Sequence, residues 1–215
     1  MLVSTMTPQE ISNELLTDLL TVERKAKVHR NLLFKQMLRK RLEREMCTIS
    51  YKTPKNNEWN IIFQLYTGHS RTAYYVKSRD SNGTIVYSVQ FFNHGDEHEE
   101  RCIIKYTTHF LQRYNERMEL GFGELSKVIK YFFRNNLEME MGQSQQLDDG
   151  TRCTQFIFPD GIGLGWRDES ARITCLKTFV ANSTLTKTQQ NMAHCIKNDL
   201  GFTTTIQPYH MVNKF

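Results

Sequence analysis

The stretch KYTTHFLQRYNERM, residues 105–118, marks a change from strand to helix near the middle of the chain. A β-favouring run ends at two threonines, and a helical segment then places His109, Arg113 and Arg117 four residues apart. At about 100° per residue, these three polar side chains lie beside an apolar arc. They can therefore line a cleft or simply extend into solvent from the edge of the core. The apolar arc, which we expect to be buried, consists of Phe110, Leu111, Tyr114 and Met118.

Before this stretch, residues 47–107 have the composition of β-strands. The tetrapeptide DSNG at 80–83 lies between two of the strand-like runs and is typical of a hairpin turn. The segment therefore predicts an antiparallel meander. Its runs, rich in β-branched and aromatic residues, are CTISYKT, WNIIFQLYTG, RTAYYVKSR, TIVYSVQFFN and RCIIKYT.

After this stretch, the pattern predicts helices at 108–118 and 123–135. The polar segment 141–151 has the composition of a loop. A second meander then contains RCTQFIF, the turn PDG, GIGLGWRD and RITCLKTFV. A final helix is expected in TLTKTQQNMAHCIKNDLG, followed by an exposed tail.

The N-terminal segment predicts a long basic helix or a helical hairpin. Thr7, Pro8 and Glu10 form a helix-start signal, and apolar residues recur at helical spacing until about residue 45. Residues 23–45 carry nine Lys and Arg against three Glu, so their net charge is +6 in a chain of net charge +5. This segment is either a nucleic-acid-binding surface or the solvated face of an amphipathic helix.

These elements predict an α+β protein in which antiparallel β-meanders pack with helices. We expect a basic helical arm at 1–46 and an α+β domain at 47–215. Within that domain, the first meander covers 47–107, two helices and the second meander cover 108–181, and a C-terminal helix and tail cover 182–215.

The composition favours a globular cytoplasmic protein. Hydrophobic residues make up 39% of the chain and charged residues 24%. The five cysteines include no CxxC pair, which favours reduced thiols. We expect no signal peptide and no membrane contact, because no apolar run approaches the roughly 20 residues of a membrane span. The glycines match no P-loop or dinucleotide-binding motif, so we expect no cofactor.

Strand alternation in the second meander indicates a polar face. Gly163 and Gly165 share one face of GIGLGWRD, which leaves a shallow strip that a helix, another backbone or a ligand can approach. In RITCLKTFV, an arginine and two threonines on one face would line a polar cleft. Strict alternation predicts that this face consists of Arg172, Thr174, Leu176, Thr178 and Val180.

The order of elements across residues 105–181, with the motifs HFLQRYNERM, FIFPDGIGLGW and TFV, resembles the barnase/colicin/RelE-type ribonuclease superfamily. That superfamily includes toxin-like members. The resemblance implies cleavage of RNA without a metal ion or cofactor. It implies a catalytic group made of His109, Arg113 and Thr178, with Arg172 as a further member.

The chemistry of such a site follows from RNA itself, because the ribose 2′-hydroxyl serves as the nucleophile. His109 can transfer a proton, and an arginine can stabilise the charge that develops on the phosphate. Tyr114 and Glu116 are candidates for the second proton-transfer group. We also expect basic side chains to bind the nucleic-acid backbone, namely Arg117, Arg39, Lys40 and Arg41.

Two other functions remain open. In the first, the protein is a non-catalytic module whose N-terminal helices bind a partner protein or a nucleic acid. In the second, His94 and His98 of NHGDEHEE bind a metal ion, as HxxxH does on a helix. Gly95 and the position between two strands favour an acidic surface turn at this place instead.

Overall fold

Two β-meanders join into one sheet in the computed structural model, which describes residues 1–93, 99–146 and 152–185. The first meander is β1 (Arg44–Lys52), β2 (Glu58–Tyr66), β3 (His69–Asp80), β4 (Gly83–Asn93) and β5 (Glu99–Tyr106). The second is β6 (Glu140–Gln146), β7 (Arg152–Phe158), β8 (Gly161–Asp168) and β9 (Ile173–Ala181). The described strands follow the order β1-β2-β3-β4-β5-β9-β8-β7-β6, and only β5 and β9 pair in parallel. The predicted α+β class is confirmed.

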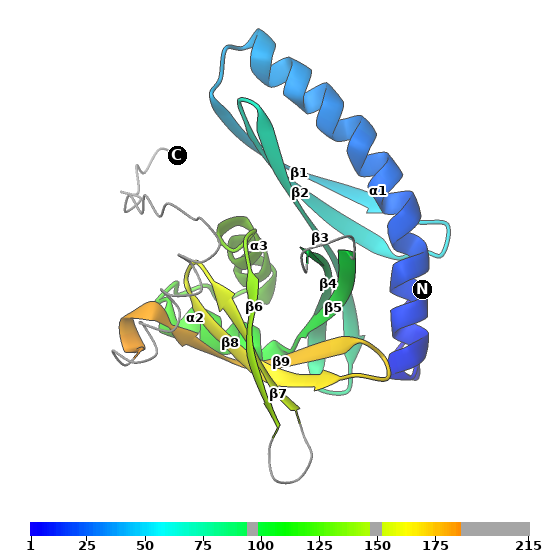
Figure 1. Cartoon of the computed structure of the whole chain (residues 1–215), viewed down its shortest axis with the longest axis vertical. Helices are drawn as coiled ribbons and strands as arrows, with labels where there is room; N and C mark the ends of the chain where they lie inside the picture. Colours follow the sequence, from blue (N-terminus) through cyan, green and yellow to red (C-terminus); the bar gives the residue numbers. More distant parts are fainter. Residues whose placement is uncertain (94–98, 147–151, 186–215) are drawn as a thin grey trace.

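Helices cover both faces of this sheet. The long helix α1 (Pro8–Arg39) runs along the outside of β1 and β2, and its C-terminal end projects together with the tips of these strands (Figure 1). The helices α2 (Thr108–Arg117) and α3 (Leu125–Asn135) lie inside the bend between the two meanders. A short 3-10 helix (Asn182–Thr184) follows β9.

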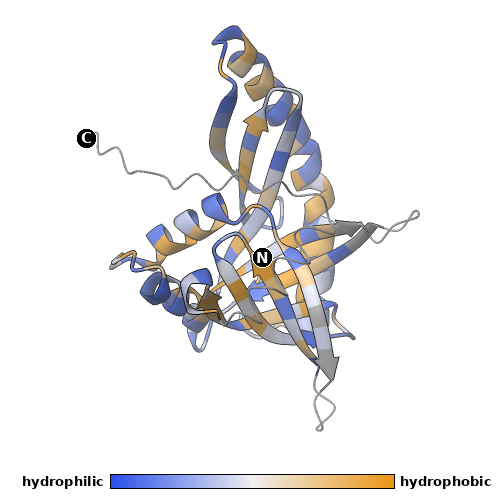
Figure 2. Ribbon diagram, turned by 60° about the vertical axis from the view of Figure 1, so that its left-hand side comes forward, coloured by the Kyte–Doolittle hydropathy of each residue, from blue (hydrophilic) through white to orange (hydrophobic). Residues whose placement is uncertain are grey.

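The sheet separates two hydrophobic clusters, and successive residues of a central strand alternate between them. In β5, Ile104 and Tyr106 pack under α2 and α3, whereas Ile103 packs on the side of α1. Figure 2 shows the corresponding alternation of hydropathy along the strands. The cluster under α2 and α3 is aromatic, and the ring centroids of Tyr106 and Phe110 lie 5.4 Å apart. Tyr106, at the end of β5, and Phe110, in the first turn of α2, are therefore both core residues.

Local signals explain where α1 begins and ends. Thr7 accepts a hydrogen bond from the Glu10 amide, and the Glu10 carboxylate accepts one from the Thr7 amide, which completes the capping box. The prediction that the helix continues to residue 45 is wrong. Arg41 adopts a left-handed conformation with φ 55°, and the Leu42 amide donates to the Met37 carbonyl. This C-terminal motif usually contains glycine, so an arginine at this position did not indicate a helix end.

The two predicted turns are confirmed, but one predicted loop is not. Asp80 pairs with Gly83 across the first hairpin, and Phe158 pairs with Gly161 across the second. The segment 141–151 was expected to be a loop, yet its residues up to Gln146 belong to β6. Backbone pairing with β7 explains the strand, since such pairing does not require apolar side chains. β6 is also a sheet edge, where polar residues are tolerated.

The predicted alternation of β9 is wrong because this strand contains a β-bulge. Leu164 pairs with Thr178, but the next residue, Gly165, pairs with Leu176, so Lys177 is an extra residue. Both Leu176 and Phe179 consequently lie in the cluster under α2. A Cβ atom on Gly165 would lie 2.0 Å from the Cys175 carbonyl oxygen, so only glycine fits opposite the bulge.

The glycine strip of β8 is occupied by protein. A Cβ atom on Gly163 would lie 3.2 Å from the ring of Phe110, which belongs to α2. A helix therefore packs over this position, as one of the three sequence interpretations proposed. At Gly165, the approaching group is instead the backbone of β9.

Other sequence predictions concern boundaries and segments outside the described residues. The segment 1–46 forms one helix rather than a hairpin, and the boundary expected after residue 46 falls inside β1. The expected C-terminal helix and tail lie beyond residue 185, outside the described residues. The candidate metal ligands His94 and His98 also lie outside them.

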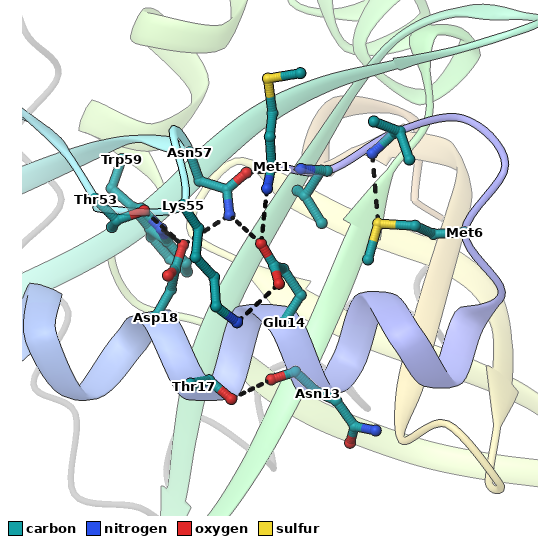
Figure 3. Close-up of polar contacts among 12 residues, drawn as sticks. Met1, Met6, Asn13, Glu14, Thr17, Asp18, Thr53, Lys55, Asn57 and Trp59 are labelled. Carbon is teal, nitrogen blue, oxygen red and sulfur yellow. Dashed lines mark hydrogen bonds and ion pairs between the residues drawn. The ribbon is translucent and has the colours of Figure 1, made fainter.

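A buried carboxylate fastens α1 to the first meander (Figure 3). Asp18 is only 4% exposed, and its Oδ2 accepts hydrogen bonds from Thr53 Oγ1 at 2.9 Å, Asn57 Nδ2 at 2.7 Å and Trp59 Nε1 at 3.3 Å. One turn earlier, Glu14 accepts from Asn57 and pairs with Lys55 at 2.8 Å. These contacts bring α1 against the turn between β1 and β2.

We expect Asp18→Ala to lower the free energy of unfolding by about 3 kcal/mol or more, because three buried donors on Thr53, Asn57 and Trp59 lose their acceptor. Urea unfolding measures this change. The control is Glu116→Ala, which removes a carboxylate that is 58% exposed and should cost less than about 0.5 kcal/mol. Equal losses for the two variants would contradict the role of Asp18.

The contribution of Glu14 to the stability of the α1 attachment should depend on pH. Burial acts to raise the pKa of its carboxyl, but hydrogen bonds from Lys55, the Met1 amine and Asn57 outweigh burial and lower the pKa from 4.5 to about 2. Because the folded-state pKa lies below the unfolded-state value, the stabilisation is present above pH 4.5 and disappears as the pH falls towards 2.

Unfolding free energies measured between about pH 5 and about pH 2 should therefore fall more steeply for the wild type than for Glu14→Gln. The glutamine keeps the shape and some hydrogen bonds but does not titrate. Parallel curves for the two proteins would exclude Glu14 as a source of acid sensitivity.

Candidate functional site

His109 lies in a hollow at the N-terminal end of α2. This hollow has a volume of about 550 Å³, and we call it the His109 hollow. Its walls come from the turn between β3 and β4, the end of β5, the first turn of α2, and strands β8 and β9. The lining residues with chemically active side chains are Asp80, Lys105, His109, Gln112, Trp166, Cys175 and Lys177.

Two threonines place His109 in this position. Thr107 caps α2 by accepting from the Phe110 amide at 3.1 Å, and its hydroxyl donates to the Leu176 carbonyl at 3.0 Å. Thr108 Oγ1 donates to the Thr84 carbonyl at 2.6 Å. Gly83 has φ 119°, and a Cβ there would lie 2.8 Å from Thr108 Oγ1. The DSNG turn therefore has to end in glycine for α2 to begin where it does.

Two lysines give the His109 hollow its charge. Lys105 Nζ lies 3.6 Å from the carboxylate of Asp80. Lys177, the extra residue of the bulge, places Nζ 4.6 Å from the centre of the Trp166 ring. The N-terminal end of α2 adds the positive end of a helix dipole. Together these groups favour an anion, and the exposed imidazole of His109 stands beside them.

The thiol in the wall of the hollow is not suited to nucleophilic chemistry. Burial raises the pKa of Cys175, and the neighbouring charges of Lys105 and Lys177 only partly oppose this effect. The thiol is 7% exposed. The thiolate is the reactive form of cysteine, and burial disfavours it here. We therefore assign Cys175 a structural role in the wall of the hollow.

The two arginines expected beside His109 have different partners. Arg113 is 45% exposed, and its Nη1 lies 2.9 Å from the Glu116 carboxylate on the same helix. Arg117 Nη1 donates to the Phe179 carbonyl of β9. Arg117 therefore ties α2 to the sheet, whereas Arg113 remains at the surface. Neither residue lines the His109 hollow as the structure describes it.

Thr178 and Arg172 are separated from His109 by the path of β9. After the bulge, alternation puts Thr178 on the face opposite to Phe179, which packs under α2. Arg172 precedes the strand, is exposed, and has φ 54°, while its carbonyl accepts from the Ile103 amide. Five residues lie between Arg172 and Thr178, so about 20 Å of extended chain separates the two. Neither side chain lines the described His109 hollow.

The expected basic residues at the end of α1 lie at the projecting end of the helix (Figure 1). Arg39 is its last residue, and Lys40 is its C-cap and lies 3.9 Å from the Glu45 carboxylate. Arg41 carries the left-handed turn that ends α1. All three side chains are exposed.

Neither candidate for the second proton-transfer group lines the described hollow. The Tyr114 hydroxyl donates to Asp160 Oδ2 at 2.5 Å, and Asn136 Nδ2 donates to the same oxygen at 2.8 Å. Burial, reinforced by the charge of Asp160, strongly raises the pKa of Tyr114. This tyrosine connects α2 to the turn before β8, and Glu116 pairs with Arg113.

Sequence reasoning identified His109 but missed the groups around it. Lys105 belongs to the stretch 105–118, and its place between the buried Ile104 and Tyr106 could have indicated that it points away from their side of the sheet. Lys177 and Trp166 were not singled out, although strand alternation places Lys177 on the same face of β9 as Cys175, and Trp166 pairs with Cys175. Asp80 was assigned only to the hairpin turn.

Neither a metal site or a membrane-spanning helix among the described residues, nor a similar protein, identifies the function of this chain. Among the described residues, no group of three or more His, Cys, Asp or Glu side chains is arranged to hold a metal ion. None of the helices in the described ranges is both long and apolar enough to cross a membrane. No family model, curated protein or solved structure matches the chain at a significant level.

We expect Arg117→Ala and Arg113→Ala to differ in stability although both arginines lie on α2. Loss of the Arg117 contact to the Phe179 carbonyl should lower the unfolding free energy by about 1–3 kcal/mol. Loss of the exposed Arg113–Glu116 pair should change it by less than about 0.5 kcal/mol. Urea unfolding of the two variants checks this, and an equal effect would remove Arg117 from the α2–β9 contact.

Proposed function

We propose that this protein is a metal-independent, RNase-like protein that acts on RNA phosphodiesters at the His109 hollow. The observation that carries the proposal is the grouping of an imidazole, two lysines and a tryptophan ring in one hollow beside a helix N-terminus. Phosphate recognition requires positive charge, and a base can stack on an aromatic ring. The imidazole provides a group that can accept or donate a proton.

The proposed reaction uses the RNA 2′-hydroxyl as nucleophile. One group removes the proton of that hydroxyl while another protonates the leaving 5′-oxygen, and a cyclic phosphate forms. We assign one of these roles to His109 and the other to the carboxyl group of Asp80, which lines the same hollow. Lys105 and Lys177 would stabilise the charge that develops on the phosphate oxygens.

The arrangement of the second half of the chain gives this proposal further support. Helices α2 and α3 are followed by the antiparallel strands β6 to β9, which is the order on which the resemblance to the barnase/colicin/RelE-type ribonucleases rests. The proposed site departs from the residues that the resemblance implied. It retains His109 and takes its cations from Lys105 and Lys177 instead of Arg113 and Arg172, with Thr178 left outside.

A non-catalytic binding module is the second candidate, and the outward face of α1 favours it. Four apolar side chains that are at least half exposed lie on this helix among basic residues such as Arg24 and Lys35. An apolar stripe of this kind is typical of a surface that meets a partner. The exposed apolar residues are Leu20, Val28, Leu32 and Leu38.

We expect purified protein to cleave single-stranded RNA in the presence of EDTA, and His109→Ala to reduce the rate by about 10²- to 10⁴-fold. His69→Ala is the matched control, because His69 is also exposed but lies at the start of β3, stacked on Tyr66. Gel analysis of labelled RNA provides the rate.

Unchanged cleavage by His109→Ala would remove this residue from the mechanism. RNA binding without any cleavage by the wild type would contradict the proposed enzyme and favour the binding module. Since α1 buries Leu15, Leu19 and Val22 against the sheet, point substitutions on its outward face test that module better than deletion of residues 1–46.

A further inference from the structure

A second depression, lined by basic residues, lies between α3 and the edge strand β1. Figure 1 shows that α3 lies inside the bend of the sheet. The volume of this depression is about 490 Å³, and we call it the α3–β1 groove. A smaller depression of about 230 Å³ shares Arg44, Met46, Arg134 and Asn135 with it, so the two form one continuous channel. The groove is lined by Arg44, Met46, Phe122, Lys127, Lys130, Tyr131, Arg134 and Asn135.

The groove is rich in cations from two elements. Lys127, Lys130 and Arg134 are spaced along one face of α3, and Arg44 stands opposite them on β1. No Asp or Glu side chain belongs to the described lining of the groove itself, whereas the smaller depression contains Glu138, which pairs with Arg71. The nearest carboxylate partner on α3 is Glu124, which lies 3.3 Å from Lys127 in an exposed pair. Such a pair exchanges readily for a phosphate.

Aromatic rings accompany these cations. Tyr131 is 36% exposed, an unusual degree for a large ring, and it lies in the middle of the cationic face of α3. The Phe122 ring packs edge-on against it, with centroids 5.7 Å apart. A ring held in this way offers a face on which an unpaired base can stack.

We propose that the α3–β1 groove binds single-stranded RNA and directs it across the protein. The inference rests on the proposed function, because it supplies the substrate strand that the His109 hollow would cut. Cations alone would suit an acidic peptide equally well, but the exposed ring among them favours unpaired bases. A duplex is disfavoured because its bases are already stacked on each other.

The test uses the full chain and a fluorescein-labelled single-stranded RNA of about 12 nucleotides, with binding followed by fluorescence anisotropy at several salt concentrations. The test variants are Lys130→Ala/Arg134→Ala and Tyr131→Ala. The control, Lys52→Ala/Lys77→Ala, removes two exposed lysines of β1 and β3 that line neither the groove nor the His109 hollow. Thermal unfolding of each variant verifies that it is folded.

We expect the Lys130→Ala/Arg134→Ala variant to lose at least about tenfold in affinity, with a salt dependence shallower by about 1.4, or 0.7 for each lost phosphate contact. Tyr131→Ala should lose about fivefold or more, and Tyr131→Phe should bind as the wild type, since stacking needs only the ring. The Lys52→Ala/Lys77→Ala control should bind unchanged. Photocrosslinking of iodouridine-substituted RNA should label Tyr131 or Phe122.

The outcomes separate the groove from the catalytic proposal. If His109-dependent cleavage occurs but the groove variants bind and cleave as the wild type, the groove inference fails and the proposed function stands. If RNA binds through the groove without being cleaved, the catalytic proposal fails and the groove stands. Three results would overturn the assignment to RNA in this groove. They are equal competition by polyglutamate, equal binding of single-stranded DNA, and loss of binding in the Lys52→Ala/Lys77→Ala control.

Discussion

The parallel pairing of β5 with β9 holds the two meanders in one sheet and fixes the position of α2. The pairing runs from Ile103 and Ile173 to Tyr106 and Leu176. Thr107 continues it, because both its amide and its hydroxyl donate to the Leu176 carbonyl. The same hydroxyl accepts from the first turn of α2, so the end of a strand and the start of a helix share one oxygen.

The bend of the sheet sets the candidate sites apart from the hydrophobic clusters. α1 is anchored on one face through Asp18, and α2 and α3 fill the other. The first turn of α2 lines the His109 hollow together with β8 and β9, whereas α3 and β1 line the α3–β1 groove. Both depressions are lined by cations, and each contains an aromatic ring. The two depressions thus have the same kinds of side chain, although they share no lining residue.

Local signals predicted the elements that depend on neighbouring residues. The two hairpin turns, the capping box of α1 and the range of α2 were all readable from short motifs. Three features were not. The strand β6 and the bulge at Lys177 depend on pairing with a neighbouring strand, and the left-handed turn at Arg41 occupies a place usually taken by glycine. The bulge also changed the candidate site, because a one-residue shift placed Thr178 on the face opposite to Leu176.

The β5–β9 contact joins residues that are far apart in the chain, such as Cys102 and Thr174, which are 72 positions apart. During synthesis, α1 and the strands β1 to β5 leave the ribosome before β9 exists. The apolar edge of β5, with Ile103 and Ile104 both fully buried in the finished protein, stays open for that interval. Contacts of such long range form slowly, and an open apolar edge invites pairing between chains. The edge of β5 is therefore most liable to pair with other chains while the second half of the protein is still being translated.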